Sequence, residues 1–408
     1  MVKLKKIEKE WSFKMKMTQT YNQHVVKKGN KSLVLQTIQE YTPISRADIA
    51  NKTGLNKGTV SSQVSELLKE NLILESGPGV SSGGRRPVML LFNHVAGYSI
   101  GVDIGVNYIL GILTDLQGNI VNEKMMKFNG LSFEEIKDEL YSIVDSLIDA
   151  MPQSPYGLVG IGIGVPGTVS TDGEILLAPN LNWKNINLKK TMEEKYNVPV
   201  QIENEANAGA YGEKKFGAGK DSSNIIYVSV GIGIGTGLIL NGELYKGNHG
   251  FSGELGHMTI EVDGPKCPCG NQGCWELYAS EKALASSAAK HGIQPENGQK
   301  LSLESLNELA ENGDAKVIEV FEEIGEYLGT GINNIINIFN PEQVIIGNRL
   351  ASSSKWLEEP LRKKQSQTLF THQKDLRIDF SQLSTHATAL GVAAYACENF
   401  LTIDIQEV

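Results

Sequence analysis

One short stretch of the chain gathers the residue types that most often carry out chemistry. Three of the four cysteines, Cys267, Cys269 and Cys274, lie within eight residues, and His257 precedes the first of them by ten positions. Such a cluster can form a disulfide, supply a catalytic thiol or hold a metal ion. The spacing alone leaves these three chemistries open.

Composition narrows the class of protein. The 408 residues suffice for two or three domains, and 40% hydrophobic and 21% charged residues are ordinary for a water-soluble globular chain. No apolar run approaches the roughly 20 residues of a membrane-spanning helix, and no apolar stretch follows the basic N-terminus as it would in a signal peptide. We therefore expect no membrane partner. Because three of the four cysteines are clustered, we also expect no disulfide framework and a cytoplasmic location.

Charge is distributed unevenly along the chain. Residues 1–92 contain 15 Lys and Arg against seven Asp and Glu, a net charge of +8. Because the whole chain carries −9, the remainder carries −17. A basic head on an acidic body indicates that only the head binds a polyanion. A solvated basic tail would explain the positive charge of residues 1–28 but not that of residues 29–92.

Residues 30–92 have the pattern of a winged helix-turn-helix. We predict a helix over 30–41, a second short helix that begins after Ser45, and a third over 57–71. A strand over 72–75 and a return strand over 87–92 would form the wing. The third helix has an apolar stripe for packing and small polar residues near its start, where a recognition helix meets base edges.

The residues between the two wing strands read GPGVSSGGRRP. A flexible linker would have this composition, but arginines beside glycine at a wing tip can also enter a minor groove. We predict that DNA is contacted by Arg46, Lys57, Thr59, Ser61, Ser62, Gln63, Arg85 and Arg86.

From Gly97 the chain alternates apolar strands with helices. Residues 98–115 and 223–245 share one pattern, a strand followed by a glycine-rich turn and a second strand. Two copies of this unit predict two α/β lobes around a cleft. Such glycine turns can bind phosphate through backbone N–H groups, although tight hairpins need glycine without any ligand as well.

The order of motifs from about residue 30 resembles the ROK family of sugar kinases and sugar-responsive repressors. The shared motifs are a winged helix, VPG, ENEAN, GFSGELGH, CPCGNQGC and WELYAS. The segments SGGRRPVMLLFN and ENEANAGAYGE resemble in particular the xylose repressors of Gram-positive bacteria. The first 16 residues fall outside this resemblance, which makes Met17 an alternative start.

The resemblance implies an α/β fold in which an N-terminal winged helix-turn-helix precedes a two-lobed, actin-like (ribonuclease-H-like) body. The expected divisions are a basic extension over 1–29, the DNA-binding domain over 30–92, and the sugar-sensing body over 93–408 with its metal motif at 257–274.

The resemblance also assigns site residues. His257, Cys267, Cys269 and Cys274 match the family's zinc motif, and three thiolates with one imidazole suit a closed, structural Zn²⁺ site. The residues that match the family's sugar contacts are Asn204, Glu205, Glu254, His257 and Glu276.

Several departures from the kinase pattern favour a regulator that no longer uses ATP. Asp103-Ile-Gly105-Val-Asn107 replaces Asp-X-Gly-Gly-Thr, Gly231-Ile-Gly233 replaces Gly-Thr-Gly, and Gly347-Asn348 replaces a Gly-Gly pair. Glu205 stands where the kinases have a catalytic Asp. Phosphoryl transfer depends on close positioning, so these changes together predict no catalytic residues.

We therefore expect a homodimeric repressor that binds a palindromic operator and is released by a sugar, D-xylose above all. Two alternatives stay open. One is a sugar kinase with an accessory DNA-binding head, and the other is a repressor that senses glucose or an N-acetylated sugar. The longer side chain of Glu205 could exclude the extra carbon of a hexose, or it could be a neutral change.

Overall fold

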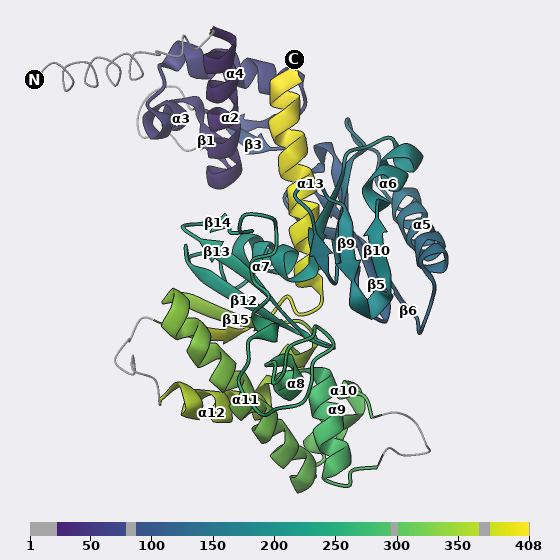
Figure 1. Ribbon diagram of the computed structural model, residues 1–408. Helices are drawn as coiled ribbons and strands as arrows, with labels where there is room; N and C mark the ends of the chain where they lie inside the picture. The colour runs from purple at the N-terminus through teal and green to yellow at the C-terminus, as the bar shows by residue number, and fades with distance from the viewer. Residues whose placement is uncertain (1–22, 79–86, 295–300, 367–375, 408) are drawn as a thin grey trace, which may run out of the picture. The chain divides into compact units, whose positions relative to one another are not determined.

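The computed structural model describes residues 23–78, 87–294, 301–366 and 376–407 (Figure 1). The chain divides into two compact units, one made of residues 1–96 and 400–408 and the other of residues 97–399. In the described part of the chain, no helix combines the length and apolar character needed to cross a membrane.

Residues 23–78 and 87–92 of the first unit form the helices α2, α3 and α4 and a small antiparallel sheet in the order β1-β3-β2. Ser45 caps the second helix by accepting a hydrogen bond from the Asp48 amide at 3.2 Å, and Asn56 caps the third by accepting one from the Thr59 amide at 2.8 Å. The elements are α2 (Gln23–Tyr41), β1 (Ile44–Ser45), α3 (Arg46–Thr53), α4 (Lys57–Lys69), β2 (Ile73–Pro78) and β3 (Val88–Phe92).

This order of elements is the predicted winged helix-turn-helix. One difference lies at its beginning, where α2 starts at Gln23, seven residues before the expected helix. Residues 23–29 are thus continuous with the first helix.

The second unit contains two five-stranded sheets. In the first sheet the order is β11-β7-β4-β5-β6, and in the second it is β14-β13-β12-β15-β16. The first five of these strands are β4 (Tyr98–Ile104), β5 (Tyr108–Asp115), β6 (Ile120–Lys127), β7 (Leu158–Val165) and β11 (Val200–Asn204). The second five are β12 (Ile225–Val230), β13 (Ile234–Leu240), β14 (Glu243–Leu244), β15 (Gln343–Gly347) and β16 (Arg377–Phe380).

The two sheets repeat one topology. In the first sheet, β4 pairs antiparallel with β5, β5 pairs antiparallel with β6, and β7 and then β11 add in parallel on the other side of β4. In the second sheet, β12, β13, β14, β15 and β16 pair in the same way and in the same chain order. The prediction of two related lobes is therefore confirmed. A smaller sheet of β8 (Thr168–Val169), β9 (Ile175–Ala178) and β10 (Trp183–Ile186) accompanies the first lobe.

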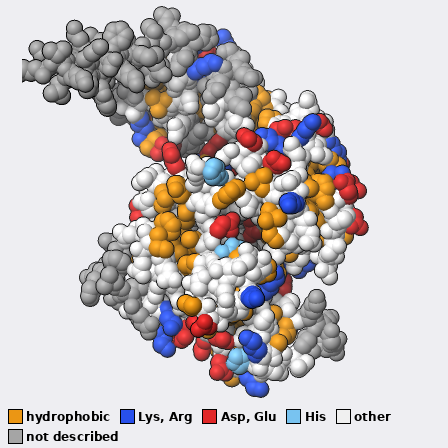
Figure 2. Space-filling view, in the orientation of Figure 1, with side chains coloured by type: hydrophobic (Ala, Val, Ile, Leu, Met, Phe, Trp, Pro, Cys, Tyr) orange, Lys and Arg blue, Asp and Glu red, His pale blue; other side chains and the backbone are white. Residues whose placement is uncertain are grey.

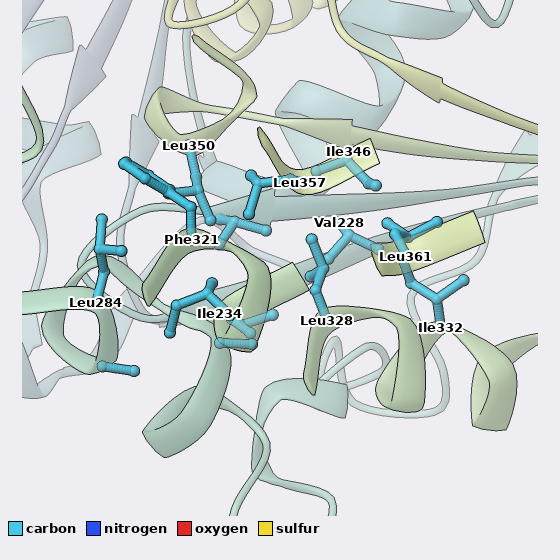
Figure 3. Close-up of a cluster of buried hydrophobic side chains, with 14 of the residues drawn as sticks. Val228, Ile234, Leu284, Phe321, Leu328, Ile332, Ile346, Leu350, Leu357 and Leu361 are labelled. Atoms are coloured by element: carbon cyan, nitrogen blue, oxygen red, sulfur yellow. The ribbon is translucent and has the colours of Figure 1, made fainter. Parts of the chain in front are cut away.

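Helices cover the sheets. They are α5 (Phe133–Asp149), α6 (Leu188–Tyr196), α7 (Glu205–Phe216), α8 (Glu276–Ala279), α9 (Glu281–Lys290), α10 (Leu303–Glu311), α11 (Ala315–Phe339), α12 (Ser354–Gln365) and α13 (His386–Glu407). In the second lobe, α11 and α12 lie on one face of the sheet (Figure 1). Their side chains Phe321, Leu328 and Leu357 pack with Val228 and Ile346 of the strands (Figure 3).

The face of the molecule drawn in Figure 2 carries acidic and basic side chains interspersed among apolar ones. Such a mixed surface is ordinary for a water-soluble body.

Helices α7 and α13 approach each other more closely than side chains would allow. A Cβ atom added to Gly391 would lie 1.9 Å from the Ala208 carbonyl oxygen, and one added to Gly212 would lie 2.1 Å from the Ala387 carbonyl oxygen. Glycine is therefore required on both helices at their crossing. This crossing fixes the position of α7, which begins at the end of β11.

Replacing Gly391 with alanine should destabilise the second unit by about 1–3 kcal/mol, because the new methyl group must push the two backbones apart. Chemical denaturation monitored by circular dichroism measures this. The control is Gly29→Ala in α2, where an added Cβ atom would have nothing within 4 Å. The control should keep the parent stability or gain up to about 1 kcal/mol, since alanine favours a helix over glycine. A Gly391→Ala chain as stable as the parent would contradict the required close approach.

Candidate functional site

A polar cavity lies in the second unit, at the carboxyl end of β11. The cavity meets the N-terminus of α7 on one side and the segment 250–254 on another. Its lining residues are Gly167, Thr168, Asn204, Asn207, Gly235, Thr236, Gly250, Ser252, Gly253 and Glu254. Amides, hydroxyls and one carboxylate therefore surround this space together with four glycines.

Asn204 joins three parts of the cavity wall. Its side-chain oxygen caps α7 by accepting hydrogen bonds from the amides of Ala206, at 2.9 Å, and Asn207, at 3.1 Å. Its side-chain nitrogen donates to the Gly167 carbonyl at 2.8 Å. The β11–α7 junction is thus fastened to the VPG loop by one side chain.

Glu254 supplies the carboxylate of the cavity. Burial raises its pKa, the nearby His257 lowers it and the nearby Glu276 raises it. The segment around it is tied to the second sheet by the Thr236 hydroxyl, which donates a hydrogen bond to the Gly253 carbonyl. Gly253 has φ of 92°, and an added Cβ atom would lie 2.4 Å from the Thr236 carbonyl oxygen, so only glycine fits there.

The four predicted metal ligands come together. One ligand atom each from His257, Cys267, Cys269 and Cys274 lies within 4.8 Å of all the others. The sulfur atoms of Cys269 and Cys274 are 3.8 Å apart, and the Cys267 sulfur is 3.7 Å from His257 Nδ1. Four ligands on a tetrahedron at about 2.1–2.3 Å from Zn²⁺ would have separations of this size. The residues present therefore fit a four-coordinate metal ion.

The backbone around the cluster explains how the ligands meet. The Cys267 amide donates to the Asn271 carbonyl at 2.8 Å, and Gly270 turns the chain with φ of 97°. Thr259 and Cys274 form an isolated antiparallel bridge that brings the last cysteine back beside His257.

Two predicted sugar contacts lie at the metal cluster and do not line the cavity. Glu276 Oε1 is 3.4 Å from His257 Nδ1 and 3.3 Å from the Cys267 sulfur. Its other oxygen lies only 2.6 Å from where a Cβ atom of Gly233 would be, so Glu276 packs against the second glycine turn. Of the five predicted contacts, Asn204 and Glu254 line the cavity, and His257 and Glu276 lie at the cluster beside it.

Glu205 also lies outside the cavity lining. Its carboxylate accepts hydrogen bonds from the Ser229 hydroxyl at 2.9 Å and from the Asn348 side chain at 2.6 Å. Burial raises its pKa, and these two hydrogen bonds partly offset the increase. Partners on the second lobe thus hold the Glu205 carboxylate. The role of Glu205 at the sugar stays a prediction.

Asp103 is the second buried acid of this region. It accepts a hydrogen bond from the Tyr108 hydroxyl at 2.5 Å. Burial raises the pKa of Asp103 well above its ordinary value and the nearby Glu205 charge raises it further, against the lowering effect of the Tyr108 bond. The two buried acids therefore lie close enough to influence each other.

At both glycine turns, groups of the chain itself form hydrogen bonds with the glycines or pack against them. The Gly105 amide donates to the Tyr108 carbonyl at 2.9 Å, and the Gly231 amide donates to the Gly233 carbonyl at 3.0 Å. The Tyr108 ring covers Gly105, and the Asn348 side chain lies 3.2 Å from where a Cβ atom of Gly231 would be. These two amides are therefore engaged and do not point to a phosphate.

In the first unit, α4 exposes part of the predicted DNA-contacting set. Lys57, Ser61 and Ser62 are exposed and Thr59 is half-buried. Gln63, however, is only 3% exposed. The expectation that Gln63 shares the exposed face is wrong, because it follows Val60 by three residues and falls on the packed side of the helix.

The predicted arginines differ in their surroundings. The Arg46 guanidinium forms an ion pair with Glu75 of β2 at 2.9 Å. Arg85 and Arg86 lie outside the described residues.

Sequence reasoning missed four polar residues of the cavity, namely Thr168, Asn207, Thr236 and Ser252. For one of them, the sequence contains a pattern that could have predicted its place in the cavity. Asn207 follows Asn204 by three residues at the start of a helix, a spacing that places both on one face.

Comparison with known proteins matches both units. A sequence model of the ROK family matches residues 99–399, and a winged helix-turn-helix DNA-binding model matches residues 30–73. The xylose repressor of Bacillus subtilis (strain 168) is 50% identical over 381 residues, which cover 93% of this chain and 98% of that protein.

Two solved structures extend the comparison. A ROK family transcriptional regulator, described as a homologue of the E. coli MLC protein, superposes with a TM-score of 0.79 at 28% identity and covers 93% of this chain and 98% of its own. A ROK family glucokinase from Streptomyces griseus, in complex with glucose and AMPPNP, superposes with a TM-score of 0.68 at 30% identity. That alignment covers 74% of this chain and 100% of the glucokinase.

Proposed function

This chain belongs to the ROK family, and we propose that it is a DNA-binding transcriptional repressor released from its operator by a sugar. The observation that carries the proposal is the polar cavity lined by Asn204, Thr236 and Glu254 in a chain that also has a winged helix-turn-helix. Amides, hydroxyls and a carboxylate are suited to the vicinal hydroxyls of a sugar, and a sugar that lacks one hydroxyl leaves its buried partner unpaired.

We propose D-xylose as the sugar and genes of xylose use as the target. The support is the 50% identity with the B. subtilis xylose repressor over nearly the whole of both chains. A dimer with twofold symmetry would suit a palindromic operator, and the cytoplasm is where such a protein would meet DNA.

The glycine turns argue against phosphoryl transfer. The amides of Gly105 and Gly231 are engaged within the chain, and the acids Asp103 and Glu205 lie beside them. A triphosphate entering here would find neither of these two amides free to donate a hydrogen bond. The proposed body therefore binds a sugar without transferring phosphate to it.

We propose that the cluster of His257, Cys267, Cys269 and Cys274 holds a structural Zn²⁺ ion. Its role would be to fix the segment that carries Glu254 and Glu276, and thereby one wall of the cavity. Bound zinc would hold these side chains in place and take no part in a reaction.

The sugar response can be tested on Glu254. Replacing Glu254 with glutamine should weaken D-xylose binding by about 1–3 kcal/mol, because a charged acceptor of a hydroxyl is lost, while operator affinity stays unchanged. Isothermal titration calorimetry and operator-release assays measure both. Glu261→Gln, an exposed acid near the metal cluster, is the matched control and should behave as the parent does.

The same preparation distinguishes the alternatives. The parent should bind D-xylose more tightly than D-glucose or N-acetylglucosamine, and it should release no ADP from ATP with any of them. Sugar-dependent ADP release would establish the kinase alternative, and tighter binding of another sugar would replace xylose as the inducer.

The metal assignment can be tested with cysteine variants. Elemental analysis should find one zinc ion per parent chain, and Cys274→Ser should lose the ion together with the response to xylose. Cys397→Ala, which removes the buried cysteine of α13 outside the cluster, should keep both. A metal-free chain that still responds to xylose would contradict the role of zinc in shaping the cavity.

The recognition helix can be tested by base preference. Ser61→Ala and Ser62→Ala should each change the preferred operator bases by about 1–3 kcal/mol per contacted base pair. The double variant Arg85→Ala, Arg86→Ala should instead weaken binding to all sequences and reduce its salt dependence. Gln63→Met, at a buried position, should leave base preference unchanged. A changed preference for Gln63→Met alone would place the recognition surface on the other face of α4.

A further inference from the structure

Asn207 has a buried side-chain oxygen atom that no described residue satisfies. The residue is 3% exposed and lines the cavity one helical turn after Asn204. Within the described part of the chain, its Oδ1 atom has no hydrogen-bond partner. Among the described residues with a buried, unpartnered side-chain oxygen or nitrogen, only Asn207 belongs to the cavity wall. A buried acceptor left without a donor is unfavourable, so a donor is expected from a ligand.

The orientation of the Asn207 amide follows from its neighbour. Its Nδ2 atom lies 3.3 Å from Glu203 Oε1, and a carboxylate can only accept hydrogen bonds. The nitrogen must therefore face Glu203, and the oxygen faces the other way. The same carboxylate oxygen of Glu203 accepts the Asn204 amide at 3.0 Å, so Glu203 is held against the β11–α7 junction.

Glu203 is a buried acid whose charge is balanced by one lysine. Its side chain is 5% exposed, and its second oxygen forms an ion pair with Lys246. Removing one partner of a buried ion pair leaves an uncompensated charge, so the pair is expected to hold both groups firmly.

Lys246 is also tied to the segment 252–254 of the cavity wall. Its carbonyl accepts a hydrogen bond from the Ser252 amide at 3.2 Å, and Ser252, Gly253 and Glu254 line the cavity. The series Lys246, Glu203, Asn207 thus connects the segment on one wall with the helix start on the other.

We propose that Asn207 Oδ1 accepts a hydrogen bond from one specific hydroxyl of the bound sugar, and that Glu203 and Lys246 are positioning residues that hold the amide for it. The inference rests on the proposed function, since it names a further contact of the same sugar site. Asn207 then contributes to specificity, because a sugar that lacks the matching hydroxyl leaves the buried oxygen unpaired.

The test compares D-xylose with its four deoxy analogues, each lacking one ring hydroxyl. Calorimetry with the full, metal-loaded chain gives the affinity of every ligand for the parent and for Asn207→Ala. The variant should bind D-xylose roughly 5- to 100-fold more weakly, the factor for one unmade hydrogen bond. It should show the same loss for three analogues and no loss for the fourth, whose missing hydroxyl is the partner of Asn207.

The matched control is Asn333→Ala in α11. Asn333 also has a buried, unpartnered Oδ1 atom and donates from Nδ2 to a carbonyl, that of Lys364 at 2.9 Å, but it does not line the cavity. This control should bind all five ligands within twofold of the parent. A second variant, Lys246→Met, leaves Asn207 in place and should reduce the discrimination against the same single analogue.

The outcomes separate the two claims. A parent chain that binds no pentose overturns the proposed function and this inference together. Sugar binding by the parent with an equal loss for all five ligands, or with no loss, in Asn207→Ala overturns the inference alone. If Asn207→Ala does not fold, unchanged discrimination in Lys246→Met overturns the positioning role.

Discussion

The crossing of α7 and α13 without intervening side chains is the constraint on which the cavity depends. Gly212 and Gly391 let the two backbones approach until a methyl group would collide with a carbonyl oxygen. With α7 fixed in this way, its first turn lies at the carboxyl end of β11, where Asn204 caps it and Asn207 follows one turn later. Close packing far from the ligand thus determines which polar atoms the ligand meets.

A second feature concerns the glycine turns, one of which lies in each lobe. Here Tyr108 covers Gly105, Asn348 covers Gly231, and Glu276 packs against Gly233. The hydrogen bonds from Asn348 and Ser229 to Glu205 connect the start of α7 with the second sheet. Side chains of the protein itself pack against these turns, which is consistent with the proposed body that binds a sugar without phosphorylating it.

Much of this arrangement could be predicted from the sequence, because its causes are local. Ser45 and Asn56 lie where helix caps are needed, the repeated strand–turn–strand pattern gives the two lobes, and the segment 257–274 that resembles the family's zinc motif brings four candidate ligands together. The errors arise at residue types that occur both in exposed and in buried positions. Gln63 has the composition of an exposed polar residue but lies at a packed position of α4.

Long-range pairing explains what could not be predicted. The motif ENEAN places Glu205 at the start of α7, but its partners Ser229 and Asn348 are 24 and 143 residues away in sequence. Likewise, nothing local pairs Glu203 with Lys246, 43 residues later, and so the orientation of Asn207 could not be foreseen. Hydrogen-bond partners across the two lobes become visible only when the lobes are assembled.

In the proposed repressor, a sugar occupies the cavity at the N-terminus of α7. A crystal structure of the full chain grown with D-xylose would locate the sugar. We expect density for one pyranose between Asn204, Asn207 and Glu254, with the side chains of Glu205 and Asn348 still bonded to each other. A pyranose bound elsewhere in the chain, or one that separates Glu205 from Asn348 to occupy the glycine turns, would contradict this proposal.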